Sequence, residues 1–385
     1  MSRNVARRLQ GLVQSDIRRM TRECERVGGI NLGQGICDLP TPPLVRDGAI
    51  EAIRARKSTY SFAEGIVELR NVIAEKLARD NGLRADPKSE IVVTVGATGA
   101  FTAAIHALLD PGDGILLFEP YYGYHLNSAI LAGLEPHYLT LDAPRVRLDE
   151  AKLRAAIRPN TRAVVVCTPG NPSGKMFDRD ELAILDRVAR DFDLLVITDE
   201  IYESIRYDGR EHVSPASVGG LWERTVSILG LSKTFSITGW RLGYAVAPEP
   251  MARAIALTHD LFYVCAPTPL QHGVAAGFAA PPSFFSDLIA GYTKKRALTC
   301  DALAAAGLAP IVPEGAYYVL ADVSALGFTT ARDAAMSLLE QTKVATIPGT
   351  AFFRGAEGER FVRVCYAKED DVLEEACRRI RAFRR

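Results

Sequence analysis

The sequence has no excess of charge of either sign and no long apolar run. Lysine plus arginine and aspartate plus glutamate each number 46, so the formal net charge at pH 7 is +0. Balanced charge provides no broad basic surface, which argues against nucleic acid as a partner. The apolar runs are shorter than the about 20 residues that a membrane-spanning helix needs. We therefore expect neither nucleic-acid binding nor insertion into a membrane.

The sequence also lacks paired cysteines and metal-ligand spacings. Its seven cysteines are scattered and show no CxxC spacing: Cys24, Cys37, Cys167, Cys265, Cys300, Cys365 and Cys377. Such cysteines are typical of free thiols in a reducing cytoplasm rather than of a disulfide framework. The six histidines form no ligand spacing with one another or with the cysteines, so no metal site is predicted.

The N-terminus lacks the apolar core and cleavage site of a signal peptide. Its sequence, MSRNVARRLQGLVQSDIRRM, carries basic residues and predicts an amphipathic arm. A transit peptide is the weaker alternative, because Asp16, Glu23 and Glu25 lie close by and such peptides are poor in acidic residues. We expect a cytoplasmic protein.

The remaining sequence is globular, with 48% hydrophobic and 24% charged residues over 385 residues, a length that allows two domains. Apolar runs predict strands at Ile91–Thr94, Ile115–Phe118, Ala163–Cys167, Leu194–Thr198 and Val226–Leu229. Helical periodicity separates them at Thr98–Leu109, Leu148–Ile157 and Asp180–Asp191. Continuous apolar strands between helices predict an α/β fold whose mostly parallel sheet is covered on both faces.

The pattern changes after Pro281. Helices are predicted at Ser283–Gly307 and Ala331–Thr342, with strands at Tyr317–Ala321 and Phe361–Tyr366 before a final helix. This order predicts a smaller α+β domain. We divide the chain into residues 1–40, an N-terminal arm and part of the small domain, residues 41–280, a large domain, and residues 281–385, the small C-terminal domain.

Lys233 follows the strand Val226–Leu229 and lies among small residues in the run Gly230–Gly243. A buried lysine is driven toward its neutral form, and a neutral amine forms a Schiff base with an aldehyde. Arg241, on the same segment, is a candidate phosphate ligand. A lysine with a phosphate ligand nearby suits pyridoxal 5′-phosphate (PLP). For a lone lysine, a surface position beside a packed Trp240 is the commoner interpretation.

Three loops follow other predicted strands, at the edge of an open sheet where ligands bind. Gly96–Gly99 opens a helix, whose free N–H groups and dipole attract phosphate. Tyr121 and Tyr122 offer a ring that can stack on a flat heterocycle. Thr168–Gly174, with two prolines and two glycines, forms a rigid loop that orients Asn171. Taken singly, each feature is also explained by an ordinary turn or a core tyrosine.

Asp199 ends the Leu194–Thr198 strand and offers a carboxylate to a protonated pyridine nitrogen. At about 4 Å with an effective dielectric near 20, that pairing contributes ~4 kcal/mol, or about three pKa units. It would keep the ring protonated at neutral pH. Tyr202 is placed to hydrogen-bond the phenolic oxygen of PLP. Five such features in one chain, each after a strand, favour a PLP site.

With these residues, the chain resembles a PLP-dependent aminotransferase of the class I/II family, which has the aspartate aminotransferase-like fold (fold type I). The resemblance covers nearly the whole length. Its specific motifs are NPSG at Asn171–Gly174, DEIY at Asp199–Tyr202, and SK at Ser232–Lys233 followed by GWRLG at Gly239–Gly243. The segments NLGQG and VRVCY, at Asn31–Gly35 and Val362–Tyr366, are similar to the branch that includes kynurenine aminotransferase and glutamine transaminase K.

The resemblance implies a role for each candidate residue. Lys233 would hold PLP as an aldimine, Asp199 would pair with its ring nitrogen, and Asn171 and Tyr202 would contact its 3-oxygen. Tyr122 would stack on the ring. The phosphate would be held by the amides of Ala97 and Thr98, by Arg241 and by the segment containing Ser232. The substrate would be bound by Arg363, which grips the α-carboxylate, by Asn171, and by the Gly33–Gly35 loop with Gly35 and Ile36.

Tyr60 resembles the tyrosine that reaches the phosphate of a neighbouring subunit's cofactor, so the resemblance implies a homodimer with shared active sites. Two positions depart from the family pattern: Gly230 replaces a serine of many relatives, and Thr98 replaces a lysine of one acidic-substrate branch. No second arginine clearly serves a dicarboxylate. The expected donor is an apolar, aromatic or glutamine-like amino acid, and the expected acceptor is a 2-oxo acid.

Candidate residues for the side-chain pocket are Ile36, Cys37, Tyr124, Phe262, Tyr263 and Phe353, for each of which plain packing is the simpler interpretation. Two other activities remain open from sequence. A PLP-dependent β-eliminating carbon–sulfur lyase would use the same Lys233 chemistry. A PLP-binding regulator is less favoured, because the arm before Asn31 is too short for a DNA-binding domain.

Overall fold

The computed structural model describes residues 6, 9, 12, 16–141 and 147–384. Much of the predicted N-terminal arm lies outside the described residues. Its described end forms the start of helix α1 (Asp16–Arg26), which buries Met20 and Cys24. Within the described part of the chain, no helix combines the length and the apolar character that crossing a membrane requires.

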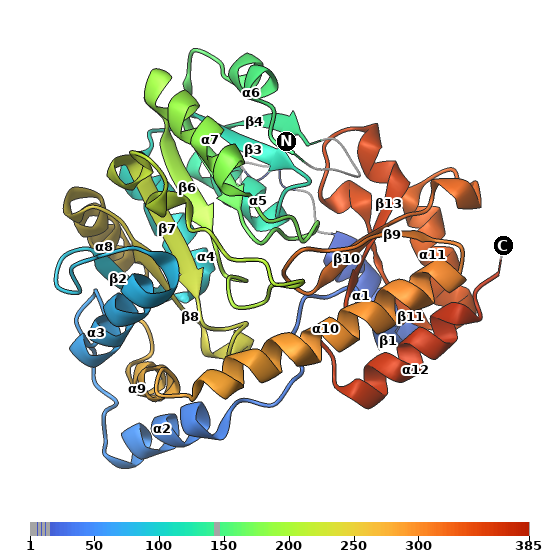
Figure 1. The fold of residues 1–385 in the computed structure, drawn as a ribbon, viewed down its shortest axis with the longest axis horizontal. Helices are drawn as coiled ribbons and strands as arrows, with labels where there is room; N and C mark the ends of the chain where they lie inside the picture. The colour runs from blue at the N-terminus through green and yellow to red at the C-terminus, as the bar shows by residue number, and fades with distance from the viewer. Residues whose placement is uncertain (1–5, 7–8, 10–11, 13–15, 142–146, 385) are drawn as a thin grey trace.

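A seven-stranded sheet forms the centre of the larger part of the molecule (Figure 1). Its strand order is β2-β8-β7-β6-β5-β3-β4. The bounds are β2 Ile91–Val95, β3 Gly114–Glu119, β4 Glu135–Thr140, β5 Thr161–Cys167, β6 Leu195–Asp199, β7 Thr225–Gly230 and β8 Leu242–Val246. All neighbouring pairs are parallel except those of β8, which is antiparallel to both β2 and β7. The predicted mostly parallel α/β fold is confirmed.

Strands β4 and β8 were missing from the sequence prediction. The β4 segment includes Pro136 and His137, which interrupt the apolar pattern, and β8 directly follows the loop that carries Lys233 and Arg241. The β4 segment therefore lacks a continuous apolar run, whereas β8 is apolar throughout but begins inside the GWRLG motif, at Leu242.

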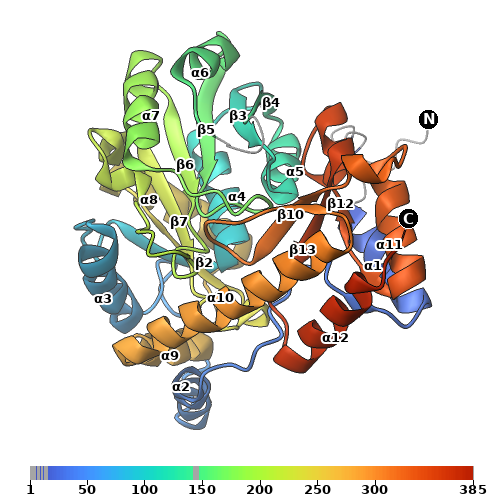
Figure 2. The same ribbon diagram turned by 45° about the vertical axis from the view of Figure 1, so that its right-hand side comes forward.

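Helices cover both faces of this sheet (Figures 1 and 2). One apolar layer contains side chains of α4 (Gly96–Leu108), α5 (Gly123–Ala132) and α8 (Glu249–Tyr263). The opposite layer contains those of α6 (Glu150–Ala156) and α7 (Arg179–Asp191). Strand β5 illustrates the cause of its continuous apolar sequence, because Ala163 and Val165 enter the first layer while Val164 and Val166 enter the second.

A smaller sheet of order β12-β13-β10-β9 lies beside the larger one. Its strands are β9 Ala309–Ile311, β10 Tyr318–Asp322, β12 Ile347–Pro348 and β13 Phe361–Cys365, and every neighbouring pair is antiparallel. Helices α10 (Pro282–Ala305), α11 (Ala331–Thr342) and α12 (Asp370–Arg381) pack around it, and α10 extends back toward α9 (Thr268–Gly277) (Figure 2).

The N-terminal segment joins this smaller part. Strand β1 (Ile30–Asn31) pairs in parallel with β11 (Val344–Ala345), and α1 packs against the same apolar cluster. The remaining helices, α2 (Pro43–Arg54), α3 (Val67–Lys76) with its π-helical extension Leu77–Asn81, and α9, lie at the larger part. The division at residues 40 and 280 stays a prediction.

Candidate active site

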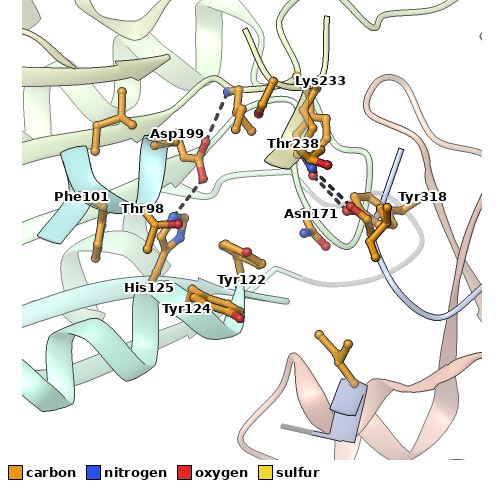
Figure 3. A pocket seen from close by; sticks show the side chains of 18 of the residues that line it. Thr98, Phe101, Tyr122, Tyr124, His125, Asn171, Asp199, Lys233, Thr238 and Tyr318 are labelled. Atoms are coloured by element: carbon orange, nitrogen blue, oxygen red, sulfur yellow. Dashed lines mark hydrogen bonds and ion pairs between the residues drawn. The ribbon is translucent and has the colours of Figure 1, made fainter. Parts of the chain in front are cut away.

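A cavity of about 450 Å³ lies between the two parts of the molecule. It is lined from the larger sheet by residues that follow strands at their carboxyl ends, and from the smaller sheet by Tyr318 and Arg363. Residues 34–36 form a further wall. In Figure 3, Thr98, Phe101 and His125 lie on one side of the cavity, and Lys233 and Tyr318 lie on the opposite side.

Lys233 lies at the cavity wall just after β7. Its Nζ donates to the carbonyl oxygen of Gly35 at 3.3 Å and lies 5.4 Å from the ring centroid of Tyr317. Burial lowers the pKa of Lys233 to about 8, and the nearby Arg241 acts in the same direction against the opposing influence of Asp199. With a pKa of about 8 instead of the ordinary lysine value of 10.5, about one Lys233 amine in ten is neutral at pH 7. Lys233 is thus prepared to react as a nucleophile or base.

Asp199 is the last residue of β6 and is buried. Its Oδ2 lies 3.0 Å from Nε2 of His125, and its Oδ1 accepts from the backbone N–H of Ile201 at 3.3 Å. His125 is itself buried on α5, where its ring meets that of Tyr122 edge-on at 5.2 Å between centroids. The carboxylate is therefore held in one orientation at the cavity wall (Figure 3).

Arg363 brings a buried positive charge into the cavity from β13, where its side chain is 1% exposed. Its Nη1 donates to Oδ1 of Asn171 at 2.8 Å, and its Nη2 donates to the carbonyl oxygen of Gly33 at 2.6 Å. The guanidinium lies 4.5 Å from the ring centroid of Tyr318 and 4.6 Å from that of Phe352. Among the described residues, Nε of Arg363 has no hydrogen-bond partner although it is buried. A planar fork with a buried, unpartnered N–H matches a carboxylate.

The start of α4 also lines the cavity, through Ala97 and Thr98. Gly96 has a φ of 68°, and a Cβ there would lie 2.7 Å from Nη2 of Arg241. The guanidinium of Arg241 therefore packs directly on the first turn of a helix, beside Ala97 and Thr98. Free N–H groups at a helix start together with an arginine form an anion site suited to phosphate.

Comparison with known proteins agrees with this geometry. Residues 27–380 match the family described as "Aminotransferase class I and II". The chain belongs to this family. It is 33% identical over 377 residues to "Aromatic-amino-acid aminotransferase 2" of Thermococcus litoralis, covering 97% of this chain and 96% of that protein. It is 31% identical over 419 residues to "Kynurenine--oxoglutarate transaminase 3" of Homo sapiens, covering 98% of this chain and 90% of that protein.

Among solved structures, N-succinyldiaminopimelate aminotransferase from Mycobacterium tuberculosis superposes with a TM-score of 0.95 at 32% identity, covering 98% of this chain and 99% of that chain. The predicted family and the fold type I architecture are confirmed: the chain is a class I/II aminotransferase, a family that depends on PLP. The three relatives are named for different amino donors, so the likeness to them does not identify the donor of this enzyme. None of these findings supports the β-eliminating or the regulatory alternative.

The residues of the cavity fit PLP. An anion site at α4, a buried carboxylate at Asp199 and a lysine whose pKa is lowered by burial surround one space. Tyr122 lies at the same wall with its ring packed on that of Tyr124 at 5.3 Å and 18°. The cavity thus offers a partner for the phosphate, the ring nitrogen, the ring face and the aldehyde of the cofactor.

Twelve of the thirteen predicted site residues line this cavity: Gly35, Ile36, Ala97, Thr98, Tyr122, Asn171, Asp199, Tyr202, Ser232, Lys233, Arg241 and Arg363. Tyr60 does not line it within this chain and is 82% exposed. Of the candidate pocket residues, Tyr124 and Ile36 line the cavity. Cys37 instead packs against Tyr292 and Ser236, Phe353 stacks on Phe361, and Phe262 and Tyr263 lie on α8 away from the lining.

Nine further residues line the cavity without being among the predicted site or pocket residues: Ile17, Gln34, Phe101, His125, Ser128, Ile201, Ile228, Thr238 and Tyr318. His125 had a detectable signal, since it lies in the first turn of α5, three residues after Tyr122, which immediately precedes that helix. Ile17 and Tyr318 had none, because they reach the cavity from α1 and β10, far along the chain from the PLP motifs.

Proposed function

We propose that the enzyme transfers the amino group of an L-amino acid with an apolar, aromatic or glutamine-like side chain to a 2-oxo acid. The observation that carries this proposal is Lys233, a lysine with a pKa of about 8 in a cavity that also contains Asp199 and Arg363. A phosphate site, a nitrogen partner and a carboxylate site lie around one reactive amine.

PLP, when bound, supplies an electron-withdrawing ring that stabilises negative charge at the substrate Cα. Asp199, oriented by His125, would face the ring nitrogen, and Tyr202 and Asn171 would face the 3-oxygen. Tyr122 would lie against the ring. The first turn of α4 with Arg241 and Ser232 would hold the phosphate. These assignments are supported by the position of each side chain in the cavity.

The chain's own residues would then bind the substrate and move its proton. The fork of Arg363 would take the α-carboxylate through its unpartnered edge, and residues 33–36 would cover it. The amine of Lys233 would remove the proton from the substrate Cα as a general base and then, as a general acid, deliver it to C4′, the aldehyde carbon of the cofactor. A pKa near neutrality serves both directions of this transfer.

The donor proposal rests on the charges of the lining. Lys233, Arg241 and Arg363 are the cations among the described residues that line the cavity, and each has one of the roles above. No arginine or lysine of this lining is left for a side-chain carboxylate. The remaining lining offers Ile17, Ile36 and other apolar groups, which favour an uncharged side chain.

We also propose a homodimer and a cytoplasmic location. Four large aromatic or aliphatic side chains are exposed, although such side chains are usually covered: Tyr60 (82%), Phe62 (72%), Leu257 (64%) and Leu261 (79%). A second copy over these surfaces would bury them and bring Tyr60 to the phosphate of its partner's cofactor. The cytoplasmic proposal is supported by the seven free cysteines.

The test is a panel of L-amino acids given to the PLP-loaded enzyme, with loss of its visible absorption band and recovery on addition of a 2-oxo acid. L-phenylalanine, L-methionine and L-glutamine should each exceed L-aspartate in kcat/KM by at least about tenfold, since an unpaired buried carboxylate costs more than ~1.4 kcal/mol.

Lys233→Ala should abolish turnover, while Lys294→Ala, at an exposed lysine of α10, should leave it unchanged. Preference for L-aspartate would contradict the donor proposal. Turnover by Lys233→Ala, or pyruvate release without an acceptor as the main reaction, would contradict the proposed chemistry.

A further inference from the structure

Tyr318 contacts two proposed functional residues of the cavity: its ring lies over Arg363, and its hydroxyl meets that of Tyr202. It is the first residue of β10 and is 2% exposed. In the antiparallel pairing, Leu320 is opposite Arg363, so Tyr318 is the diagonal neighbour of the arginine on the same face. Its ring lies 4.5 Å from the guanidinium carbon, and its hydroxyl lies 3.0 Å from the hydroxyl of Tyr202.

The hydroxyl of Tyr318 occupies a space that the backbone leaves for it. A Cβ added at Gly35 would overlap that hydroxyl, so only glycine fits beside it. The carbonyl oxygen of Gly35 accepts from Lys233 and from Tyr317, at 3.3 and 3.2 Å. The loop that carries Gly35 is thereby fixed on one side of the Tyr318 hydroxyl, and Tyr202 is fixed on the other.

The direction of the Tyr202–Tyr318 hydrogen bond follows from counting protons. Burial raises the pKa of both phenols, of Tyr202 well above its ordinary value, so both keep their single proton at neutral pH. If Tyr202 donates its proton to the 3-oxygen of PLP, it can only accept from Tyr318. The order is then Tyr318 to Tyr202 to the cofactor oxygen, and an accepted hydrogen bond strengthens the one that is donated.

We propose that Tyr318 is a positioning residue with two separable actions: its hydroxyl directs the proton of Tyr202 to the cofactor 3-oxygen, and its ring holds Arg363 in the plane in which it receives the substrate carboxylate. The inference rests on the proposed roles of Tyr202 and Arg363. It adds Tyr318, which lies outside the sequence motifs that carry the other proposed roles.

Each action has its own readout in the PLP-loaded enzyme. The first is the pH at which the visible absorption band titrates, which reports the proton on the Lys233 nitrogen. A strong hydrogen-bond donor to the 3-oxygen of PLP reduces the negative charge on that oxygen. The oxygen then attracts the proton on the Lys233 nitrogen less strongly, so the band titrates at a lower pH. The second is the dissociation constant of 3-phenylpropionate, a carboxylate without an amino group, which reports the arginine.

Tyr318→Phe removes only the hydroxyl. The titration should move upward by about half a pH unit, a part of the ~0.7 unit that a full hydrogen bond is worth, and 3-phenylpropionate should bind within twofold of wild type. Tyr318→Leu removes the ring as well. It should show the same upward shift and, in addition, about fivefold weaker 3-phenylpropionate binding, the size of one cation–π contact.

Tyr207→Phe is the matched control, because it also breaks a buried tyrosine pair, with Tyr366 at 2.8 Å, but lies outside the cavity lining. It should change neither readout. A Tyr318→Phe titration equal to wild type would overturn the action of the hydroxyl, and equal 3-phenylpropionate binding in Tyr318→Phe and Tyr318→Leu would overturn that of the ring. Absence of the visible band in PLP-treated wild type would instead overturn the proposed function, and this inference with it.

Discussion

Replacing Arg363 by lysine should weaken substrate binding strongly while leaving the cofactor bound. The substitution keeps the positive charge but removes the planar fork. Arg363 is 1% exposed and already donates to Asn171 at 2.8 Å and to the carbonyl oxygen of Gly33 at 2.6 Å. A lysine has one nitrogen, so it cannot keep both of these bonds and also meet two carboxylate oxygens in one plane.

The size of the effect follows from the contacts that disappear. One charge-assisted hydrogen bond to the substrate carboxylate is worth about 1.5–3 kcal/mol. The guanidinium also lies over the rings of Tyr318 and Phe352, at 4.5 and 4.6 Å from their centroids, and a lysine ammonium would not reproduce these planar contacts. A loss of about 2–3 kcal/mol corresponds to about 30–150-fold weaker carboxylate binding.

The measurement is a titration of the PLP-loaded variant with 3-phenylpropionate, together with kcat/KM for L-phenylalanine. The affinity for 3-phenylpropionate and the kcat/KM for L-phenylalanine should fall by about the same factor. The visible band of the variant before the ligand is added should equal that of wild type. Arg296→Lys is the matched control: Arg296 is buried, bonds both carboxylate oxygens of Asp208 at 2.8 and 2.6 Å, and stacks on Tyr207 at 4.4 Å, but it does not line the cavity.

A loss of less than about threefold in Arg363→Lys, with the band intact, would refute the assignment of Arg363 as the carboxylate site. A loss of the same size in Arg296→Lys would refute the local explanation, because the effect would then come from general destabilisation of a buried arginine. Loss of the band in Arg363→Lys alone would show that Arg363 holds the cofactor rather than the substrate.

Two further predictions concern Lys233 and Tyr60. Because burial lowers the pKa of Lys233 to about 8, the neutral, reactive fraction of its amine rises about tenfold from pH 7 to pH 9 and then levels off. The rate of PLP uptake by the apoenzyme should follow the same curve. A rate that still rises tenfold per pH unit above pH 9 would indicate a lysine with its ordinary pKa. Tyr60→Phe should lower PLP affinity by about tenfold, the size of one hydrogen bond to a charged group, without changing the dimer mass in light scattering; a wild-type affinity, or a monomer in the wild type, would contradict the shared site.

The sequence alone was sufficient to predict the strands that carry the PLP motifs. These strands are buried on both faces, as the two apolar layers around β5 show, so each is a continuous apolar run that can be recognised locally. The residues at their carboxyl ends converge because parallel strands end at one edge of a sheet. Lys233, Asp199 and Asn171 could therefore be grouped before any contact was known.

Strand β8 marks the boundary of that reasoning. It begins inside the GWRLG motif and runs antiparallel between β2 and β7. Nothing within Leu242–Val246 specifies this insertion, because strand order depends on which edge hydrogen bonds are free after the rest of the sheet has formed. The GWRLG motif that ends at Gly243 predicts a phosphate ligand, and it does not by itself predict the strand that begins within it.

The tertiary structure alone decided which side chains support the motif residues. His125 meets Asp199 across 74 positions of sequence and Tyr318 meets Tyr202 across 116. Ile17 reaches the cavity from an N-terminal helix that packs with the smaller sheet. A local pattern reports the period of burial and the turns, whereas these contacts depend on how α1, α5 and β10 dock, and docking is set by the summed packing of distant residues. The reactive groups of this enzyme were therefore readable from its sequence, and the groups that orient them only from its fold.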